Sequence, residues 1–247
     1  MDRSMNAIAV ANLIQEISTE KKVNLGNCCQ LFTPAYWKFQ YEILGEDKDY
    51  YCYKFSDNIL EEVVACLLGG YGIKAEIGHM AFYRLKESGL IKEKANYEEI
   101  ENALQKPFLV KDKYKIYRFF KQKASYISSF LGREDLNSIP NSSQDLRAWL
   151  LTVKGIGLKT ASWITRNYCG CDSVAIIDIH IYRAGVIAGI FPKNMDIRND
   201  YYELEERYLT FCKTIDVRPS IMDSIMWSQM KDAGHLAISI FNQINQS

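Results

Sequence analysis

Apolar residues recur along most of the chain at spacings of three and four, as they do on the buried face of a helix. One run shows this spacing clearly, at Ile59, Val63, Cys66, Leu67 and Gly70. Side-chain oxygens or a proline suited to a first turn precede three helical segments, in Ser56-Asp57, Ser142-Ser143 and Pro219-Ser220. Breaks that contain glycine or proline divide the chain into roughly eight to ten helices of ordinary length. The pattern therefore predicts an all-α fold.

The helical pattern suggests three segments. With 247 residues, 48% of them hydrophobic, the chain is long enough for one large domain or for two small ones that share a cleft. Residues 1–55 are expected to pack with the C-terminal helices, although residues 28–53 are rich in aromatics and admit short strands or loops. Residues 56–181 are expected to form a helical barrel subdomain that carries residues 150–164. Residues 182–247 are expected to form a C-terminal helical subdomain.

The charge balance alone neither favours nor excludes a nucleic-acid partner, because 30 basic residues offset 30 acidic ones. One stretch departs from this balance. Residues 106–123 hold seven Lys or Arg and one acidic residue, Asp112, interleaved with aromatics. The stretch fits either the solvated face of an amphipathic helix or a phosphate-binding surface.

The sequence shows no feature that is typical of a membrane protein or of a metal-binding protein. No apolar run approaches the roughly 18 residues that a membrane span requires, and residues 1–20 lack the features of a signal peptide. We therefore expect a cytoplasmic protein. The seven cysteines are an odd number at uneven spacing and the three histidines are scattered, which predicts reduced thiols and no metal site.

Residues 150–164 have the pattern of a helix, a tight turn and a second helix. Gly155 and Gly157 allow positive φ angles at low cost, and Ile156 between them can fill the gap between the helices. The amides of the turn and the N-terminus of the second helix then point outward with partial positive charge, which suits a phosphate. Glycines also close many helix pairs for packing alone, so the turn by itself leaves both interpretations open.

Two titratable residues near this turn are candidates for catalysis. Lys159 falls in the first turn of the second helix, where the macrodipole disfavours a cation, as partial burial would too. A neutral amine is a nucleophile. Asp178 interrupts the apolar run of residues 175–181, and a buried carboxylate needs a partner or a role. Capping a helix that starts near Ile179 would keep this carboxylate ionised and aim it at a developing positive charge.

Together these residues resemble the helix-hairpin-helix DNA glycosylase superfamily. Three features carry the resemblance: the Gly-Ile-Gly hairpin, Lys159 at the place of the catalytic lysine of the bifunctional members, and Asp178 at the separation seen in 8-oxoguanine DNA glycosylases. The Asp-X-His from Asp178 to His180 is similar to the same subfamily. The resemblance implies two helical subdomains with the active site in the cleft between them, and it implies that Lys159 and Asp178 are catalytic.

The resemblance also implies how DNA is bound. Gly155, Ile156, Gly157 and His180 are expected to contact the DNA backbone. The short N-terminal segment points to the compact archaeal-type enzymes. No cofactor is expected, although the hairpin is a candidate site for a monovalent cation. An iron–sulfur cluster is not expected, because too few cysteines lie near the C-terminus.

Asp223 and Trp227 are candidates for base recognition. They are four residues apart and therefore lie on one helix face. A flipped base needs a flat surface to stack on and a polar group that reads its edge, and an Asp/Trp pair is similar to the archaeal-type enzymes. The alternative is that Trp227 is a core residue and Asp223 a solvated one. Tyr71 follows a helix similar to one that ends at a DNA-facing loop in the superfamily, so Tyr71 is a candidate wedge for the gap left by the flipped nucleotide.

The function implied is that of a bifunctional DNA glycosylase and AP lyase that acts in base excision repair. It would flip out and excise an oxidised purine, 8-oxoguanine first among them, through a lysine Schiff base, and then cleave the strand by β-elimination. The expected partner is double-stranded DNA with a damaged base. The protein is expected to be a monomer, nucleoid-associated if bacterial or archaeal. Two alternatives stay open: a glycosylase of the same fold for another modified base, for example in phage DNA, and a non-catalytic helix-hairpin-helix DNA-binding protein.

Overall fold

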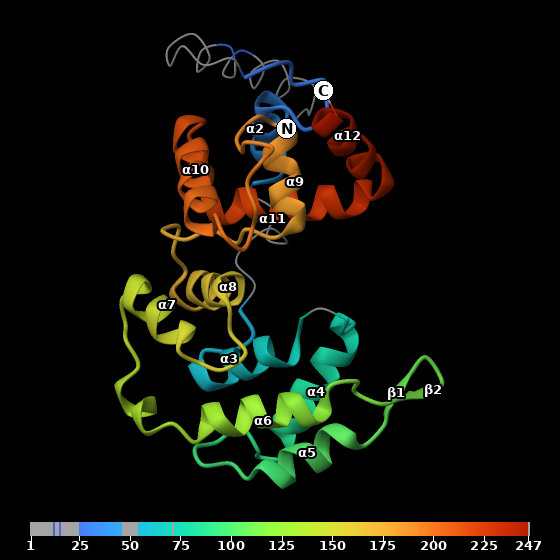
Figure 1. Cartoon of the computed structure of the whole chain (residues 1–247), viewed down its shortest axis with the longest axis vertical. Helices are drawn as coiled ribbons and strands as arrows, with labels where there is room; N and C mark the ends of the chain where they lie inside the picture. Colours follow the sequence, from blue (N-terminus) through green and yellow to red (C-terminus); the bar gives the residue numbers. More distant parts are fainter. Residues whose placement is uncertain (1–11, 13–14, 16–24, 46–53, 71, 247) are drawn as a thin grey trace. The chain divides into compact units, whose positions relative to one another are not determined.

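The computed structural model describes residues 12, 15, 25–45, 54–70 and 72–246. The chain divides into two compact units, one of residues 53–170 and one that combines residues 1–52 with residues 171–247. Helices form nearly all of the regular structure (Figure 1), and the only strands within the described ranges are two of three residues each. The predicted all-α class is confirmed. The finer division at residues 55 and 181 stays a prediction.

The unit of residues 53–170 is a group of helices around a hydrophobic core. In chain order its elements are α3 (Ile59–Leu68), α4 (Ala75–Glu87), α5 (Tyr97–Gln105), β1 (Phe108–Val110), β2 (Lys113–Lys115), α6 (Phe120–Leu131), a short 3-10 helix (Glu134–Ser138), α7 (Ser143–Leu151) and α8 (Leu158–Cys169). Val63, Phe82 and Ile127 are each at most 2% exposed in this core. The core also contains Ile156, so the turn between α7 and α8 is anchored to it.

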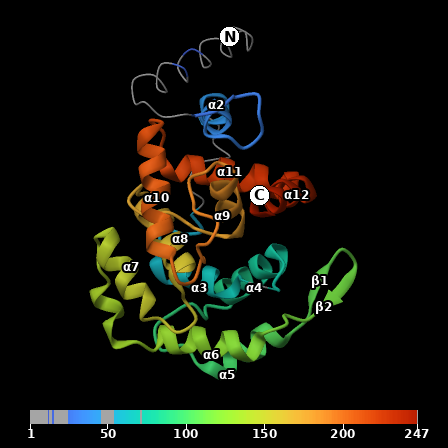
Figure 2. The same cartoon turned by 45° about the horizontal axis from the view of Figure 1, so that its top comes forward.

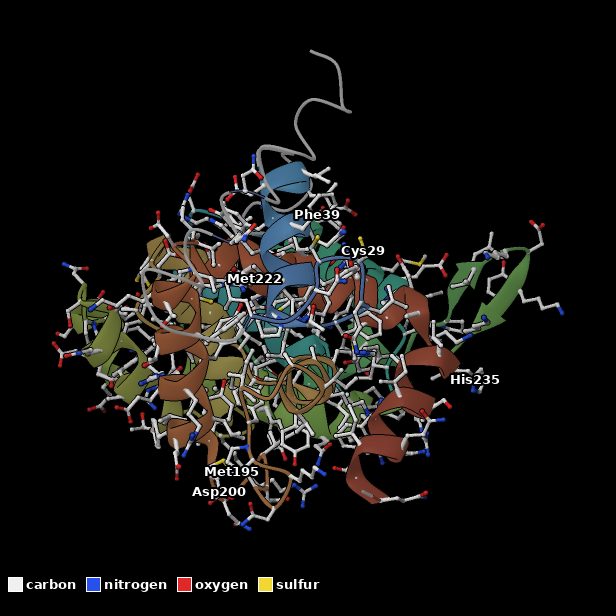
Figure 3. All side chains as sticks on the ribbon, turned by 90° about the horizontal axis from the view of Figure 1, so that it is seen from above. Cys29, Phe39, Met195, Asp200, Met222 and His235 are labelled. Carbon is white, nitrogen blue, oxygen red and sulfur yellow. The ribbon has the colours of Figure 1, made fainter. Side chains whose placement is uncertain are left out.

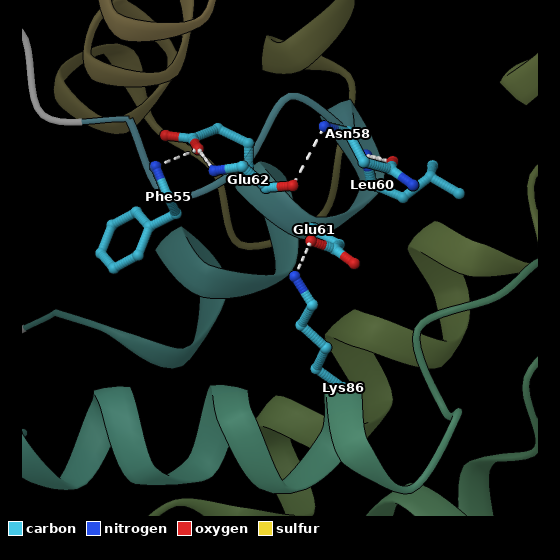
Figure 4. A network of polar contacts seen from close by, with 7 residues as sticks. Phe55, Asn58, Leu60, Glu61, Glu62 and Lys86 are labelled. Atoms are coloured by element: carbon cyan, nitrogen blue, oxygen red, sulfur yellow. Dashed lines mark hydrogen bonds and ion pairs between the residues drawn. The ribbon is translucent and has the colours of Figure 1, made fainter.

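A polar network fixes the start of α3 (Figure 4). The cap is Asn58, two residues after the predicted Ser56, and its side chain accepts a hydrogen bond from the N–H of Leu60 at 2.9 Å. The fully buried Glu62 turns back over the helix start, where its carboxylate accepts from the N–H groups of Phe55 at 2.8 Å and Ser56 at 3.1 Å. Burial raises the pKa of Glu62.

Residues 108–115 form a β-hairpin, so the amphipathic-helix interpretation of the basic stretch is wrong for this part. Leu109 pairs with Tyr114, and the two-residue turn of Lys111 and Asp112 has positive φ angles of 47° and 61°. Such a turn matches the twist of paired strands. The hairpin projects from the edge of its unit in both Figure 1 and Figure 2. The helical part of the stretch begins only at α6.

Arg84 of α4 anchors the base of this hairpin. Its guanidinium donates to the carbonyl oxygens of Ala103 and Pro107, both at 2.9 Å, and lies 3.4 Å from the ring centroid of Phe108. The hairpin is therefore held at a fixed angle to the helices. Lys123 does not belong to an exposed basic face, because its ammonium donates to the carbonyl of Gly69 at 2.9 Å and burial lowers its pKa.

The second unit is built from five described helices. They are α2 (Pro34–Leu44), α9 (Ile179–Ile187), α10 (Tyr201–Thr214), α11 (Pro219–Ala233) and α12 (His235–Gln246). Helix α11 packs against α2, α9 and α10. The Tyr36 hydroxyl on α2 donates to Gln229 on α11 at 2.6 Å, and the amide of Gln229 donates to Gln40 at 2.8 Å. Figure 3 labels Phe39 on α2, Met222 on α11 and His235 at the start of α12.

Candidate active-site residues

The predicted helix-hairpin-helix motif is present as α7, a turn and α8. Gly155 has a φ of 92°, and a Cβ at this position would lie 2.3 Å from the Tyr126 ring, so only glycine fits. Ile156 is 7% exposed and fills the space between the helices as predicted. Gly157 does not use this conformational freedom, because its φ is −104°. A Cβ on Gly157 would meet no atom of the described residues within 4 Å, so the backbone here is open to a ligand.

Lys159 is the second residue of α8. Gly157 occupies the N-cap of this helix and has no side chain to satisfy the first amides, which therefore remain available to an anion. The predicted position of Lys159 in the first helical turn is correct. Its side chain is exposed within its unit, so the expected partial burial is not found there.

Asp178 is the N-cap of α9, as predicted. Its Oδ1 accepts hydrogen bonds from the backbone N–H of His180 at 2.8 Å and of Ile181 at 3.0 Å. The residue is only 7% exposed. Its Oδ2 accepts a third hydrogen bond, from the indole Nε1 of Trp227 at 3.0 Å. These three donors restrain the orientation of the carboxylate.

The segment that leads to Asp178 is held by two residues of α10 that sequence reasoning missed. The Tyr201 hydroxyl donates to the carbonyl of Ala175 at 3.0 Å and accepts from the N–H of Ile177 at 3.2 Å. The buried Glu205 accepts from the N–H of Ala175 at 2.9 Å. These residues belong to a stretch rich in acidic residues, and nothing in the local sequence separates a buried glutamate from its solvated neighbours.

Trp227 lies on α11 with 37% of its surface exposed, whereas Asp223 on the preceding turn is 5% exposed. The alternative in which Trp227 is core and Asp223 solvated is therefore wrong. The His180 ring meets the Trp227 ring edge to face, with centroids 6.0 Å apart. Lys231, a further turn along α11, places its ammonium 4.5 Å from the Trp227 ring centroid. Its spacing of four residues from Trp227 is the sequence signal that could have found Lys231.

The structure brings together Asp178, His180 and Trp227, which all belong to the second unit. Lys159 and the hairpin of residues 155–157 belong to the other unit. The pairing of Lys159 with Asp178 therefore stays a prediction. The candidate wedge Tyr71 lies outside the described residues.

Within the described ranges, no group of three or more His, Cys, Asp or Glu side chains is arranged to hold a metal ion. The helices of the described part of the chain include none that is long and apolar enough to cross a membrane.

Solved structures with the same architecture come from DNA repair enzymes. The 8-oxoguanine DNA glycosylase of Methanocaldococcus jannaschii matches with a TM-score of 0.54 at 23% identity, over 89% of this chain and 94% of that one. A trapped endonuclease III–DNA intermediate matches with a TM-score of 0.51 at 14% identity, over 81% of this chain and 83% of that one. The fold is that of the helix-hairpin-helix DNA glycosylases.

Sequence comparisons identify the family within the helix-hairpin-helix DNA glycosylases to which the chain belongs. The family model for 8-oxoguanine DNA glycosylase (Ogg-HhH) matches residues 46–217. The chain belongs to this family, and the predicted resemblance is confirmed. An 8-oxoguanine DNA glycosylase/AP lyase of Metallosphaera sedula is 30% identical over 171 residues, which are 67% of this chain and 78% of that protein. A Saccharolobus islandicus protein of the same name is 34% identical over 122 residues, 45% of this chain and 58% of the relative's length.

Proposed function

We propose that this chain is a bifunctional DNA glycosylase and AP lyase that excises 8-oxoguanine from duplex DNA in base excision repair. The observation that carries the proposal is the position of Lys159, exposed in the first turn of α8 directly after the Gly-Ile-Gly hairpin, in a chain of this family. The names of the curated relatives and a solved complex of the M. jannaschii enzyme with DNA that contains 8-oxoguanine support the same substrate.

The proposed reaction uses Lys159 as the nucleophile. Its amine nitrogen attacks C1′ of the sugar as the bond from C1′ to the base breaks, and the base leaves with the bonding electron pair and takes up a proton. Asp178, held at the start of α9, stabilises the positive charge that develops on the sugar. The lysine nitrogen then expels O4′ as the sugar ring opens and passes a proton to it, which leaves a Schiff base at C1′ and a hydroxyl at C4′. The Schiff base acidifies the C2′ hydrogen, and loss of that proton expels the 3′ phosphate by β-elimination.

The remaining residues bind the substrate in this proposal. The turn of residues 155–157 and the uncapped start of α8 hold a backbone phosphate, and His180 contacts a second one. Asp223 reads the edge of the flipped base and Trp227 stacks on it. We further propose that the protein acts as a cytoplasmic monomer, nucleoid-associated if it is bacterial or archaeal. A monovalent cation at the hairpin is part of the same proposal.

Borohydride trapping tests the proposed function. With a duplex that contains 8-oxoguanine opposite cytosine, the wild-type chain is expected to form a covalent adduct, and Lys159→Gln is expected to form none. Lys154→Gln is the matched control, because Lys154 is an exposed lysine of the same turn and should leave the adduct intact. An equal loss in both variants would indicate that Lys159 only binds phosphate, as in the non-catalytic alternative.

A second candidate substrate is favoured by the charge of the chain. Thirty basic and thirty acidic residues are unusual for an enzyme that scans duplex DNA, because phosphate binding is largely electrostatic. This balance fits a glycosylase with the same chemistry that removes another modified base, for example from phage DNA. Trapping by an oligonucleotide with a different modified base, without trapping by 8-oxoguanine, would replace the first proposal with this one.

A further inference from the structure

The indole N–H of Trp227 is directed at the carboxylate that the proposed mechanism places at the sugar. We propose that Trp227 is a positioning residue for Asp178, in addition to any stacking on the flipped base. The inference rests on the proposed function, in which Asp178 stabilises the charge that develops on the sugar. It assigns the two roles to different parts of one side chain, the ring plane and the Nε1–H group.

The hydrogen bonds of Asp178 show what Trp227 contributes. Oδ1 is fixed by the backbone N–H groups of His180 and Ile181, at 2.8 Å and 3.0 Å. These donors belong to α9 itself and hold one oxygen at the helix start. Rotation about the Cβ–Cγ bond of an aspartate is otherwise soft. The bond of 3.0 Å from Trp227 to Oδ2 therefore restrains the plane of the carboxylate.

The Trp227 ring is held in a definite orientation by its surroundings. The ring of His180 meets it at an interplanar angle of 74°, and the ammonium of Lys231 lies over it at 4.5 Å. A cation over an indole ring is attracted to its π electrons, so Lys231 stabilises the orientation that points Nε1–H at Asp178. Asp172 restrains the start of α11, because its carboxylate accepts a hydrogen bond from the backbone N–H of Ser220 at 2.9 Å.

The arrangement predicts that loss of the indole N–H slows base release more than it weakens binding. A carboxylate that rotates away from the sugar would no longer face the developing charge, and misplacement of a catalytic group by about 1 Å can cost two orders of magnitude in rate. Stacking alone predicts little change in either quantity, because an aromatic ring without the N–H keeps its flat surface.

The decisive variant is Trp227→Phe, which keeps an aromatic plane and removes the donor. Release of 8-oxoguanine from a duplex with the lesion opposite cytosine would be measured under single turnover with saturating enzyme, and duplex affinity by titration. The rate constant is expected to fall about tenfold, which corresponds to about 1.4 kcal/mol, while the affinity changes less than about twofold. A rate constant within about twofold of wild type would overturn the inference whatever the affinity.

A double-mutant cycle with Asp178→Asn separates positioning from a structural role. If Trp227 acts through Asp178, Trp227→Phe should change the residual rate less than about twofold in the Asp178→Asn background. A full tenfold loss in that background would contradict the inference. If Asp178→Asn releases no measurable base, the cycle cannot be completed. The rate constant of Trp227→Phe in the wild-type background then decides whether the positioning role holds. Thermal unfolding of each variant checks the fold, which should survive because Trp227 is 37% exposed.

A graded test is Lys231→Met, which removes the cation over the ring and keeps the indole N–H. Its rate constant at saturating enzyme is expected to lie closer to wild type than that of Trp227→Phe, and the reverse order would count against the inference.

Failure of the proposed function gives a different result. A wild-type chain that releases no 8-oxoguanine would contradict both proposals, whereas wild-type release with an unchanged Trp227→Phe rate contradicts only the positioning role.

Discussion

At the scale of single residues, the two glycines of the helix-hairpin-helix turn have different tasks. Gly155 is required by the fold, because its φ is positive and a Cβ would collide with the Tyr126 ring. Gly157 has an extended backbone and open space around it. The first glycine therefore closes the turn, and the second leaves room for whatever approaches the start of α8.

Substitution of these glycines by alanine is expected to separate stability from DNA binding. Gly155→Ala should lower the free energy of unfolding by about 1–3 kcal/mol, because it combines backbone strain with a steric clash. Gly157→Ala should cost less than about 1 kcal/mol and should act mainly on duplex affinity, through the methyl group placed beside the phosphate. Urea unfolding and duplex titration of both variants test this, and equal unfolding free energies would contradict it.

At the scale of elements, the start of α3 contains an ionisable group whose burial affects stability. Burial raises the pKa of Glu62 above its usual value of 4.5. Between 4.5 and the raised pKa, the folded chain therefore binds a proton that the unfolded chain has lost. Stability must then fall as the pH rises through this window, and the loss is complete above it.

Glu62→Gln tests whether the burial of this carboxylate makes stability fall as the pH rises. The amide retains an oxygen that can accept from Phe55 and Ser56 and carries no charge at any pH. The variant is expected to lose this part of the pH dependence and to be at least as stable as wild type at neutral pH. The control is Glu61→Gln, which breaks a surface ion pair with Lys86 at 2.7 Å and should slightly destabilise at neutral pH. Urea unfolding at several pH values measures both effects, and a less stable Glu62→Gln at neutral pH would refute the argument.

The β1–β2 hairpin is the element on which the phosphate-binding interpretation of the basic stretch now depends. Lys111 and Lys113 are exposed on it, with Asp112 between them. If they contact DNA, the double variant Lys111→Gln/Lys113→Gln should bind a duplex several-fold more weakly and reduce the slope of log K against log salt by about 1–2. Lys92→Gln/Lys94→Gln, two exposed lysines elsewhere in the same unit, is the control. Equal salt slopes for both double variants would mean that the hairpin is not a DNA contact.

At the scale of the whole molecule, sequence reasoning succeeded where the determining contacts are local. The hairpin turn and the cap by Asp178 depend on residues within a few positions of one another, and both follow from spacing. The hydrogen bond between Trp227 and Asp178 joins residues 49 positions apart, and no local pattern predicts it. The β1–β2 hairpin was missed because its turn, Lys111-Asp112, lacks the glycine or asparagine that usually marks two-residue loops.

The anchored hairpin would also affect how a chain without net charge approaches DNA. A molecule without net charge gains nothing from uniform attraction to a polyanion, but a basic segment fixed on a rigid support creates a local field that orients the approach. Because Arg84 holds the hairpin base, that field keeps a constant direction relative to α4 and its neighbours. If the hairpin contacts DNA, this field would favour encounters in which the hairpin faces the duplex.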